Sequence, residues 1–349
     1  MRLWTRTVLA GAAAAAVALP VQLGMGHPAG AATLTPVKIG IQPQQSSAGL
    51  FWAIKMGYFK RHGLDLQPVI YPNTPAKIQA LQANVVQFAN GDNVTVIAAV
   101  ANAGVNLKIV APDNGISRND SIRMQKDDKF AFLVDPTTLC MKNDTKISGW
   151  KDLEGKTFAI NARAGGVELA IRRLVRKSGG NPDLIKFAVI PSPATLAAVK
   201  SGNVDVGLAT KPFAEQCDSD PDTKVWGHVI GSYYTVGGPQ QVVFTTGPYY
   251  NANPQIVRAF QAASYEYIRD TKLAKNKASL AQSAAELTKT PLQDILNSYP
   301  INYWNAPLTR DWVQGFVDDM VAEKFIRQRL DARGLIIPQY VPATRTRLA

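Results

Sequence analysis

Short runs of apolar residues alternate with segments of helical periodicity over the first third of the chain. Residues 37–41 read Val-Lys-Ile-Gly-Ile, an apolar run typical of a strand, and a polar stretch follows at 42–47. A helix is predicted next, because Leu50, Ile54 and Tyr58 recur at helical spacing before a glycine. The pattern then predicts strands at 65–71, 85–88 and 107–110, a helix that starts at Thr74-Pro75 with Thr74 as its cap, and a helix after a turn at 90–93.

This order of elements repeats after a shift of 118 residues. Strands are predicted at 156–160, 186–190 and 204–206, and Ser192-Pro193-Ala194 opens a helix as Thr74-Pro75-Ala76 does. The matched spacing indicates two similar lobes, each Rossmann-like in its alternation of strands and helices. Such alternation is typical of α/β folds with parallel sheets, whose ligands bind where strands end and helices expose their first N–H groups.

From residue 250 onward the pattern is helical. Apolar residues at helical spacing predict helices over 254–270, 276–288, 291–297 and 308–330. Each of these helices has an apolar face that needs a partner. We therefore expect the C-terminal helices to pack onto the first lobe.

The first 32 residues are typical of a signal peptide. Arg2 and Arg6 precede an apolar run at 7–19, and Ala29-Gly30-Ala31 matches an A-x-A cleavage site. The run is shorter than the roughly 20 residues that a membrane-spanning helix needs. We therefore expect export to the periplasm, with cleavage near Ala31 or Ala32.

Composition argues against several other functions. The chain has 38 Lys and Arg against 26 Asp and Glu, a formal charge of +12. These basic residues are scattered, which argues against a nucleic-acid partner, and the densest cluster, at 172–177, is interpreted as the solvated face of a helix. With three His and two Cys in 349 residues, we expect neither a metal nor a cofactor.

Cys140 and Cys217 are the two cysteines, and an exported protein can hold a disulfide. The sequence leaves open whether they pair or remain two separate thiols. No nucleophile elbow, P-loop, zinc-protease or dinucleotide-binding motif is present in the chain. A binding protein is therefore favoured over an enzyme.

Four segments of the chain resemble a known family. They are FWAIKMGYFKRHGLDLQPV at 51–69, KIQALQANVVQFANGDN at 77–93, DLEGKTFAI at 152–160 and ATLAAVKSGNVDVGLATKPF at 194–213. They are similar to the periplasmic solute-binding proteins of ABC importers, in the branch for sulfonates, taurine and nitrate. That branch also holds the NMT1/THI5-like binders of thiamine pyrimidine precursors.

The resemblance implies a type II periplasmic binding protein fold, with two α/β lobes joined by a two-segment hinge that closes on the ligand. Lobe 1 would comprise 33–120 and 236–349, lobe 2 would comprise 121–235, and the second crossing would use 240–246. The implied partners are a small-molecule ligand and an ABC importer permease in the inner membrane, and we expect a monomer. No role follows for the stretch 121–147.

Candidate ligand contacts lie at strand ends and helix starts, and two aromatic residues are further candidates for stacking on a ring. The loop candidates are Gln44, Gln45, Ser46, Ser47, Asn93, Gly165 and Gly166, and the aromatic candidates are Trp52 and Tyr234. Asp92 is expected to cap the helix that follows it. The alternatives are an ordinary polar loop for the first group and a place in the core for Trp52.

Lys211 is the candidate that carries a charge. It lies in the pair Lys211-Pro212 after the strand at 204–206, where relatives often have Glu-Pro. A lysine that faces the cleft favours an anionic solute. The alternative is a side chain that points to solvent.

We therefore predict an exported receptor of an ABC importer that binds a small anionic organic solute of the sulfonate, taurine or nitrate kind. The alternative ligand is a neutral or aromatic heterocycle such as a thiamine pyrimidine precursor. A sensor module with the same lobes and a pyrimidine synthase-like enzyme rank below these. The enzyme ranks lowest because His62 and His228 alone remain after export and the two cysteines lie 77 residues apart.

Overall fold

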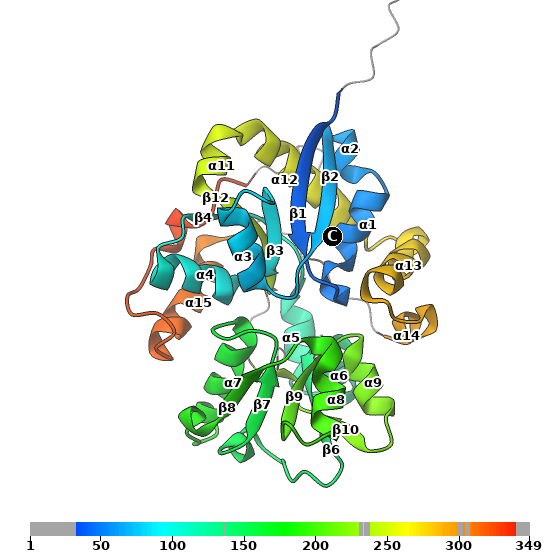
Figure 1. The fold of residues 1–349 in the computed structure, drawn as a ribbon, viewed down its shortest axis with the longest axis vertical. Helices are drawn as coiled ribbons and strands as arrows, with labels where there is room; N and C mark the ends of the chain where they lie inside the picture. The colour runs from blue at the N-terminus through cyan, green and yellow to red at the C-terminus, as the bar shows by residue number, and fades with distance from the viewer. Residues whose placement is uncertain are drawn as a thin grey trace, which may run out of the picture. The chain divides into compact units, whose positions relative to one another are not determined.

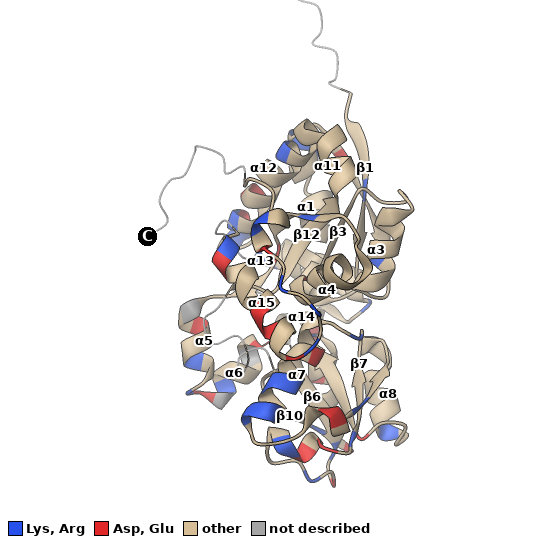
Figure 2. Ribbon diagram, turned by 90° about the vertical axis from the view of Figure 1, so that its left-hand side faces the viewer, with Lys and Arg blue, Asp and Glu red and all other residues tan. Residues whose placement is uncertain are grey.

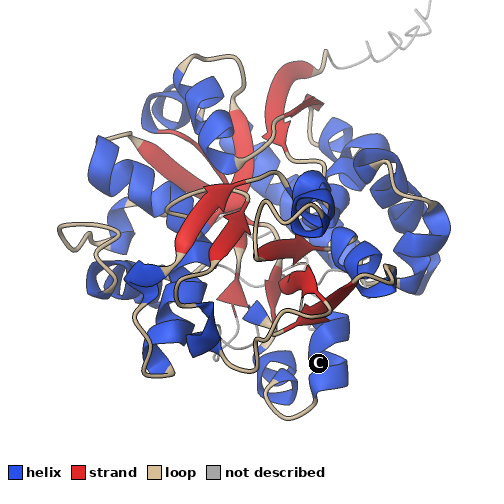
Figure 3. Ribbon diagram, turned by 60° about the horizontal axis from the view of Figure 1, so that its bottom comes forward, coloured by secondary structure: helices blue, strands red, loops and turns tan. Residues whose placement is uncertain are grey.

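The computed structural model describes residues 33–135, 137–229, 233, 238–298, 303 and 308–339. The predicted signal peptide and Tyr234 lie outside these residues. Two five-stranded sheets, each flanked by helices, form the cores of two lobes (Figures 1 and 3). Within the described residues, no helix combines the length and the apolar character needed to cross a bilayer.

The first lobe contains the sheet β2-β1-β3-β12-β4. Its strands are β1 (Thr35–Ile41), β2 (Leu64–Ile70), β3 (Phe88–Asp92), β4 (Leu107–Pro112) and β12 (Gln241–Thr246). β1 is parallel to β2 and β3, whereas β12 runs antiparallel to both β3 and β4. The prediction of parallel strands is therefore confirmed for β2, β1 and β3, whereas β12, which enters from the far half of the chain, makes the sheet mixed.

The second lobe contains the sheet β10-β6-β9-β7-β8. Its strands are β6 (Thr137–Lys142), β7 (Thr157–Ile160), β8 (Lys186–Val189), β9 (Val206–Thr210) and β10 (Thr223–Trp226). β7 is parallel to β8 and β9, and β6 is antiparallel to β9 and β10. The two sheets thus have the same plan, with three parallel strands, one reversed strand and an outer strand, which confirms the prediction of two similar lobes.

Two short strands link the lobes. β5 (Gly115–Ile116) leads out of the first lobe and β11 (Gly238–Pro239) leads back, and the two pair antiparallel. A Cβ atom on Gly115 would lie 2.3 Å from the carbonyl oxygen of Gly238, so only glycine fits there. These paired crossings are the two-segment hinge. The predicted second crossing at 240–246 is therefore corrected, because residues 241–246 form β12 within the first-lobe sheet.

Helices cover both sheets, and the C-terminal ones belong to the first lobe. The α-helices are α1 (Ala48–Lys55), α2 (Tyr58–Arg61), α3 (Thr74–Gln82), α4 (Asn93–Ala103), α5 (Arg118–Met124), α6 (Asp128–Val134), α7 (Gly166–Lys177), α8 (Thr195–Lys200), α9 (Phe213–Ser219), α11 (Gly247–Ala252), α12 (Pro254–Asp270), α13 (Lys277–Thr288), α14 (Leu292–Asn297) and α15 (Arg310–Ala322). Short 3₁₀ turns occur at Gln45–Ser47, Trp150–Leu153, Pro182–Leu184, Ser192–Ala194, Ala274–Asn276 and Ala332–Gly334.

Local chemistry accounts for several helix starts. Asp92 caps α4 as predicted, since its carboxylate accepts a hydrogen bond from the backbone N–H of Thr95. The predicted cap of α3 is displaced by one residue, because the side chain of Asn73, not Thr74, accepts from the N–H of Ala76. The predicted turn at 90–93 is also corrected, since β3 continues through Asp92 and α4 begins at once.

The C-terminal helices complete the core of the first lobe. Phe260 of α12 stacks on Phe88 of β3 with a ring-centroid distance of 4.3 Å. Val313, Phe316 and Val317 of α15 share an apolar cluster with residues of α4. The prediction that these helices pack onto the first lobe is confirmed.

The stretch 121–147, for which the sequence indicated no role, forms the helices α5 and α6 and the strand β6. Asp127 caps α6 by accepting from the N–H of Phe130. Met124 and Ala131 lie in the same apolar cluster as β12 and α15. This connection is thus a packed element rather than a loose insertion.

A disulfide joins Cys140 on β6 to Cys217 on α9. Both residues are fully buried, and they lie 77 positions apart in the sequence. The bond fastens α9 to the sheet of the second lobe and closes a loop over most of that lobe.

Candidate ligand-binding site

A cavity of about 90 Å³ lies where the two lobes and the hinge meet. The first lobe contributes polar residues that follow β1 and end β3, and the second contributes the loop after β7 and the end of β9. The lining consists of Gln42, Gln44, Ser46, Thr74, Asp92, Asn114, Thr137, Asn161, Gly165, Gly166, Val167, Thr210, Lys211, Gln240 and Gln241. This is the position expected for an α/β fold, because the carboxyl ends of its parallel strands meet at one edge of each sheet.

The predicted site residues divide into two groups. Gln44, Ser46, Gly165, Gly166 and Lys211 line the cavity. Gln45, Ser47, Asn93 and Trp52 do not line it, and Tyr234 lies outside the described residues.

Trp52 lies in the core of the first lobe and is 1% exposed. Its indole N–H donates to Ser279 Oγ of α13 at 2.9 Å. Trp52 therefore does not offer a surface on which a ring in the cavity could stack. The physical reason is that α1 presents this side chain to α13, not to the strand ends.

Asn93 contacts the hinge instead of the cavity. Its Nδ2 donates to the carbonyl oxygens of Pro239 at 3.0 Å and Gln240 at 3.1 Å. Because Gln240 lines the cavity, Asn93 fixes the backbone that carries this wall residue. Ser47 likewise lies behind the wall, where its Oγ accepts from Asn90 at 3.0 Å.

Asp92 links the lobes at the cavity. Besides capping α4, its carboxylate accepts a hydrogen bond from the N–H of Gly166, the first residue of α7, at 3.0 Å. Thr95 donates from its N–H at 2.9 Å and from its Oγ1 at 2.6 Å. The carboxylate is thus surrounded by donors from both lobes, and an N–H of the α7 N-terminus is directed to an anion.

Lys211 lies inside the cavity wall rather than in solvent and is 3% exposed. Its Nζ lies 3.3 Å from Glu215 Oε1, one helical turn along the chain. Burial lowers the pKa of Lys211, and the nearby Glu215 opposes this shift. Lys211 thus has Glu215 as an ionic partner and forms part of the cavity wall.

Two polar atoms of lining residues have no hydrogen-bond partner in the part of the chain that the structure describes. They are Thr210 Oγ1 and Gln240 Nε2. A buried polar atom without a partner costs about 1–3 kcal/mol. A bound polar solute would supply the missing partners.

Beneath the cavity, a buried polar network joins the first-lobe strands. Lys77 of α3 is 0% exposed, and its Nζ donates to Gln42 Oε1 at 2.8 Å and to Asn90 Oδ1 at 3.1 Å. Asn90 Nδ2 donates in turn to Asp113 Oδ2 at 3.0 Å. Tyr267 donates from its hydroxyl to Asp113 Oδ1 at 3.4 Å.

Lys77 was not predicted as a site residue, although the sequence contains a signal for it. Thr74, Lys77, Ile78 and Leu81 recur at the spacing of one helix face, and all four are buried. A lysine within such a stripe is a candidate buried cation. It was overlooked because lysine is usually assigned to solvent.

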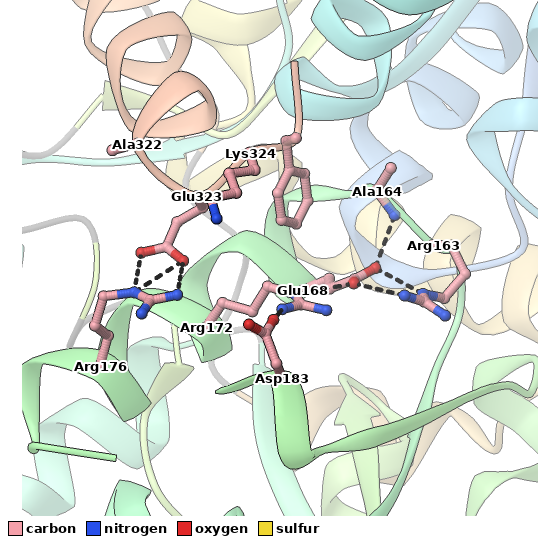
Figure 4. Close-up of a pocket in the computed structure, with 10 residues that line it drawn as sticks. Arg163, Ala164, Glu168, Arg172, Arg176, Asp183, Ala322, Glu323 and Lys324 are labelled. Atoms are coloured by element: carbon pink, nitrogen blue, oxygen red, sulfur yellow. Dashed lines mark hydrogen bonds and ion pairs between the residues drawn. The ribbon is translucent and has the colours of Figure 1, made fainter. Parts of the chain in front are cut away.

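A second hollow of about 540 Å³ lies between α7 of the second lobe and the end of α15 of the first (Figure 4). Arg176 donates from Nε and Nη2 to the carboxylate of Glu323, whose side chain is 0% exposed, at 3.0–3.2 Å. Arg173 contacts Asp319 at 3.0 Å and Glu323 at 3.5 Å. Basic α7 and acidic α15 are visible in Figure 2.

The interpretation of 172–177 as a solvated helix face holds in part, because the side chains of Arg173 and Arg176 are 38% and 50% exposed. It missed that both residues also reach across to the first lobe. These ion pairs require the two lobes to be close together. We call Arg173, Arg176, Asp319 and Glu323 the interlobe clasp.

Replacing Glu323 by Gln is expected to weaken closure, because it removes the carboxylate that receives both arginines. Pairs of this kind contribute about 1 kcal/mol when partly exposed, roughly a fivefold change in the open-to-closed ratio. Small-angle X-ray scattering of the ligand-free variant should show a larger radius of gyration than that of the wild type.

Arg172→Gln is the matched control, since Arg172 pairs with Glu168 and Asp183 within its own lobe. An Arg172 variant that opens as much as the Glu323 variant would contradict the role of the clasp.

Comparisons with known proteins agree with this architecture. A family model described as the NMT1-like family matches residues 30–287. The alkanesulfonate-binding protein SsuA from Xanthomonas axonopodis pv. citri, bound to MOPS, is 17% identical, with a TM-score of 0.70 over 88% of this chain and 99% of that chain. The periplasmic nitrate-binding protein NrtA from Synechocystis PCC 6803 is 16% identical, with a TM-score of 0.68 over 86% of this chain and 84% of that chain.

The periplasmic aliphatic sulphonate binding protein SsuA from Escherichia coli is 17% identical, with a TM-score of 0.64 over 86% of this chain and 97% of that chain. No curated protein matches the chain in sequence. These likenesses show the fold, which is the type II periplasmic binding protein fold found in solute-binding components of ABC importers.

Proposed function

Because the chain belongs to the NMT1-like family, we propose that it is an exported receptor that traps a small solute between its lobes and delivers it to the permease of an ABC importer. One observation carries this proposal. The cavity is walled by both lobes and the hinge, and it contains the unpartnered atoms Thr210 Oγ1 and Gln240 Nε2. A solute that contacts both lobes only in the closed state would drive closure through that difference.

The lining supports a small solute with an oxyanion group. Amides and hydroxyls make up most of the described wall, Val167 is its single apolar side chain of any size, and no aromatic ring lines it. Lys211 supplies positive charge to the wall, and the side-chain amides of Gln42, Gln240 and Gln241 supply N–H groups. We propose a sulfonate-, taurine- or nitrate-like anion, because a flat heterocycle would find no stacking partner in this wall.

Separate observations support the proposals that the protein is exported and that it binds a solute. The first 32 residues are typical of a signal peptide, and a buried disulfide suits an oxidising compartment. No group of three or more His, Cys, Asp or Glu within the described ranges is placed to hold a metal ion. We propose a monomeric binder rather than an enzyme.

Loss of the Lys211 charge should weaken binding of an anionic solute. We expect Lys211→Met to raise the dissociation constant of an oxyanion about tenfold or more, which corresponds to the roughly 1.4 kcal/mol expected for one charge-assisted hydrogen bond. The measurement is isothermal titration calorimetry on the chain from residue 33 onward, unfolded and refolded to remove carried ligand. Lys200→Met is the control, since Lys200 pairs with Asp220 and Asp222 at the surface of the same lobe.

A thermal-shift panel identifies the solute for that titration. It holds nitrate, taurine, alkylsulfonates, carboxylates and pyrimidines, each at about 100 times a micromolar dissociation constant, where binding adds roughly 2.7 kcal/mol. A shift with one oxyanion class supports the proposal. A shift with pyrimidines alone would replace the proposed solute class, and no shift with any member would contradict a receptor for this range of solutes.

A further inference from the structure

Lys77 is a lysine enclosed in the first lobe directly behind the cavity wall. It is 0% exposed, and its Nζ donates to two amide oxygens, those of Gln42 and Asn90. No carboxylate lies within 4.0 Å of its ammonium nitrogen among the described residues. A buried cation normally has an anionic partner in contact, because leaving water is costly for a charge.

The position of Lys77 determines how Gln42 faces the cavity. An ammonium group only donates hydrogen bonds, so the side-chain oxygen of Gln42 must turn toward Lys77. The NH₂ group of the same amide then points the other way, where Nε2 donates to the carbonyl oxygen of Pro72 at 3.3 Å and retains a second N–H. Gln42 lines the cavity, so the part of its amide available to a solute is a donor.

Two further glutamines of the wall have the same polarity. Gln241 Oε1 accepts from Asn114 Nδ2 at 3.3 Å, which leaves the NH₂ group of Gln241 for the cavity. Gln240 Nε2 is buried without a partner in the described part of the chain. These three glutamines thus offer N–H groups, which match the acceptor oxygens of an oxyanion. Asp92, the one carboxylate among the described lining residues, already accepts hydrogen bonds from Thr95 and Gly166.

We propose that Lys77 is a specificity-determining residue of this site, which orients Gln42 as a donor and adds a buried positive charge one amide away from the solute, so that an oxyanion is preferred over its neutral analogue. This inference rests on the proposed function, since it concerns the same cavity and the same solute class.

The titration of Lys77 gives the proposal a measurable signature. Burial lowers the pKa of Lys77 to about 7, and Asp92 at the end of β3 and Asp113 after β4 oppose that shift. Burial raises the pKa of Asp113 to about 6, against the hydrogen bond from Asn90 and the charge of Lys77, and Tyr267 of α12 and Tyr303 also face Asp113.

The sign of the pH dependence follows from these groups. Below about pH 7 Lys77 is charged before the solute arrives, and above it the solute must recruit a proton. An anion should therefore bind more tightly as pH falls from about 8 to about 6, with proton uptake on binding near the upper end. Protonation of Asp113 near pH 6 removes a negative charge and acts in the same direction.

The test compares ethanesulfonate with ethyl methyl sulfone, in which a methyl group replaces the charged oxygen. Calorimetry at pH 6, 7 and 8, in two buffers of different protonation enthalpy, measures the dissociation constant and the protons taken up. For the wild type we expect about tenfold tighter binding of ethanesulfonate at pH 6 than at pH 8. Lys77→Met should weaken that binding at pH 6 about tenfold or more. It should also remove the share of Lys77 in the pH slope and in the proton uptake, which leaves only the share of Asp113 near pH 6.

The control is Lys108→Met, a lysine of β4 in the same lobe whose Nζ donates to the carbonyl oxygen of Gly334. It should behave as the wild type. Thermal melting shows whether each variant is folded, and a purely structural role for Lys77 would lower the melting temperature without changing the pH slope.

Two outcomes overturn the inference in distinguishable ways. A Lys77→Met variant that binds ethanesulfonate with the wild-type constant and slope removes Lys77 from the selection of solutes, while the proposed function stands. A wild type that binds the sulfone as tightly as the sulfonate contradicts the proposed solute class itself.

Discussion

Gly238→Ala should lower the free energy of unfolding by about 3 kcal/mol or more. Gly238 has a φ of +136°, a conformation that side chains rarely adopt, and a Cβ there would lie 1.5 Å from Trp312 Nε1. Backbone strain of this kind costs of the order of 1–3 kcal/mol, and overpacking adds a similar amount. Because Gly238 belongs to the hinge strand β11, the damage should also change how far the lobes can close.

Urea denaturation measures this effect. The matched control is Gly315→Ala in the exposed interior of α15, where no atom lies within 4 Å of a new Cβ. That variant should gain about 0.5–1 kcal/mol, since alanine is the better helix former. Adding Trp312→Ala to the Gly238 variant should restore part of the loss, and no restoration would show that the steric conflict with the indole is not its cause.

Removal of the disulfide is the second large expected effect. The bond between Cys140 and Cys217 closes a loop of 77 residues, for which chain entropy predicts a stabilisation of about 4–5 kcal/mol. The double variant Cys140→Ala and Cys217→Ala avoids burying new hydroxyl groups at two fully buried positions. We expect its melting temperature to fall by roughly 10 °C.

Reductant supplies the control for that prediction. Dithiothreitol should lower the melting temperature of the wild type toward that of the double variant and leave the variant unchanged. The disulfide does not stabilise the protein if reductant is shown to open the bond and the melting temperature of the wild type stays the same.

The elements that the sequence predicted correctly are those whose pattern lies in neighbouring residues of the chain. The apolar run at 37–41 and the polar residues after it predicted β1 and the wall residues Gln44 and Ser46. Asp92 was predicted as a cap from its place before a helix, and it is one. These inferences worked because capping and strand patterns depend on neighbours in the sequence.

The elements that were missed depend on distant partners. β6 has no polar alternation that marks it as a strand, and only its pairing with β9 and β10 makes it one. Trp52 was a candidate ligand contact because of its residue type, and Ser279, far along the chain, decides its place in the core. The pairing of Arg173 and Arg176 with Glu323 was missed, because no residue near them in the sequence indicates that partner.

The position of β12 has a consequence for how the chain is made. β12 (Gln241–Thr246) lies between β3 and β4, so these two strands have no common neighbour until residue 246 has been synthesised. The second sheet needs only residues 137–226 and can form earlier, with its own disulfide. During that interval β3 and β4 present unpaired edges, and unpaired strand edges are where nascent chains misassemble. The first-lobe sheet, whose first four strands lie within 35–112, is thus begun first and completed last.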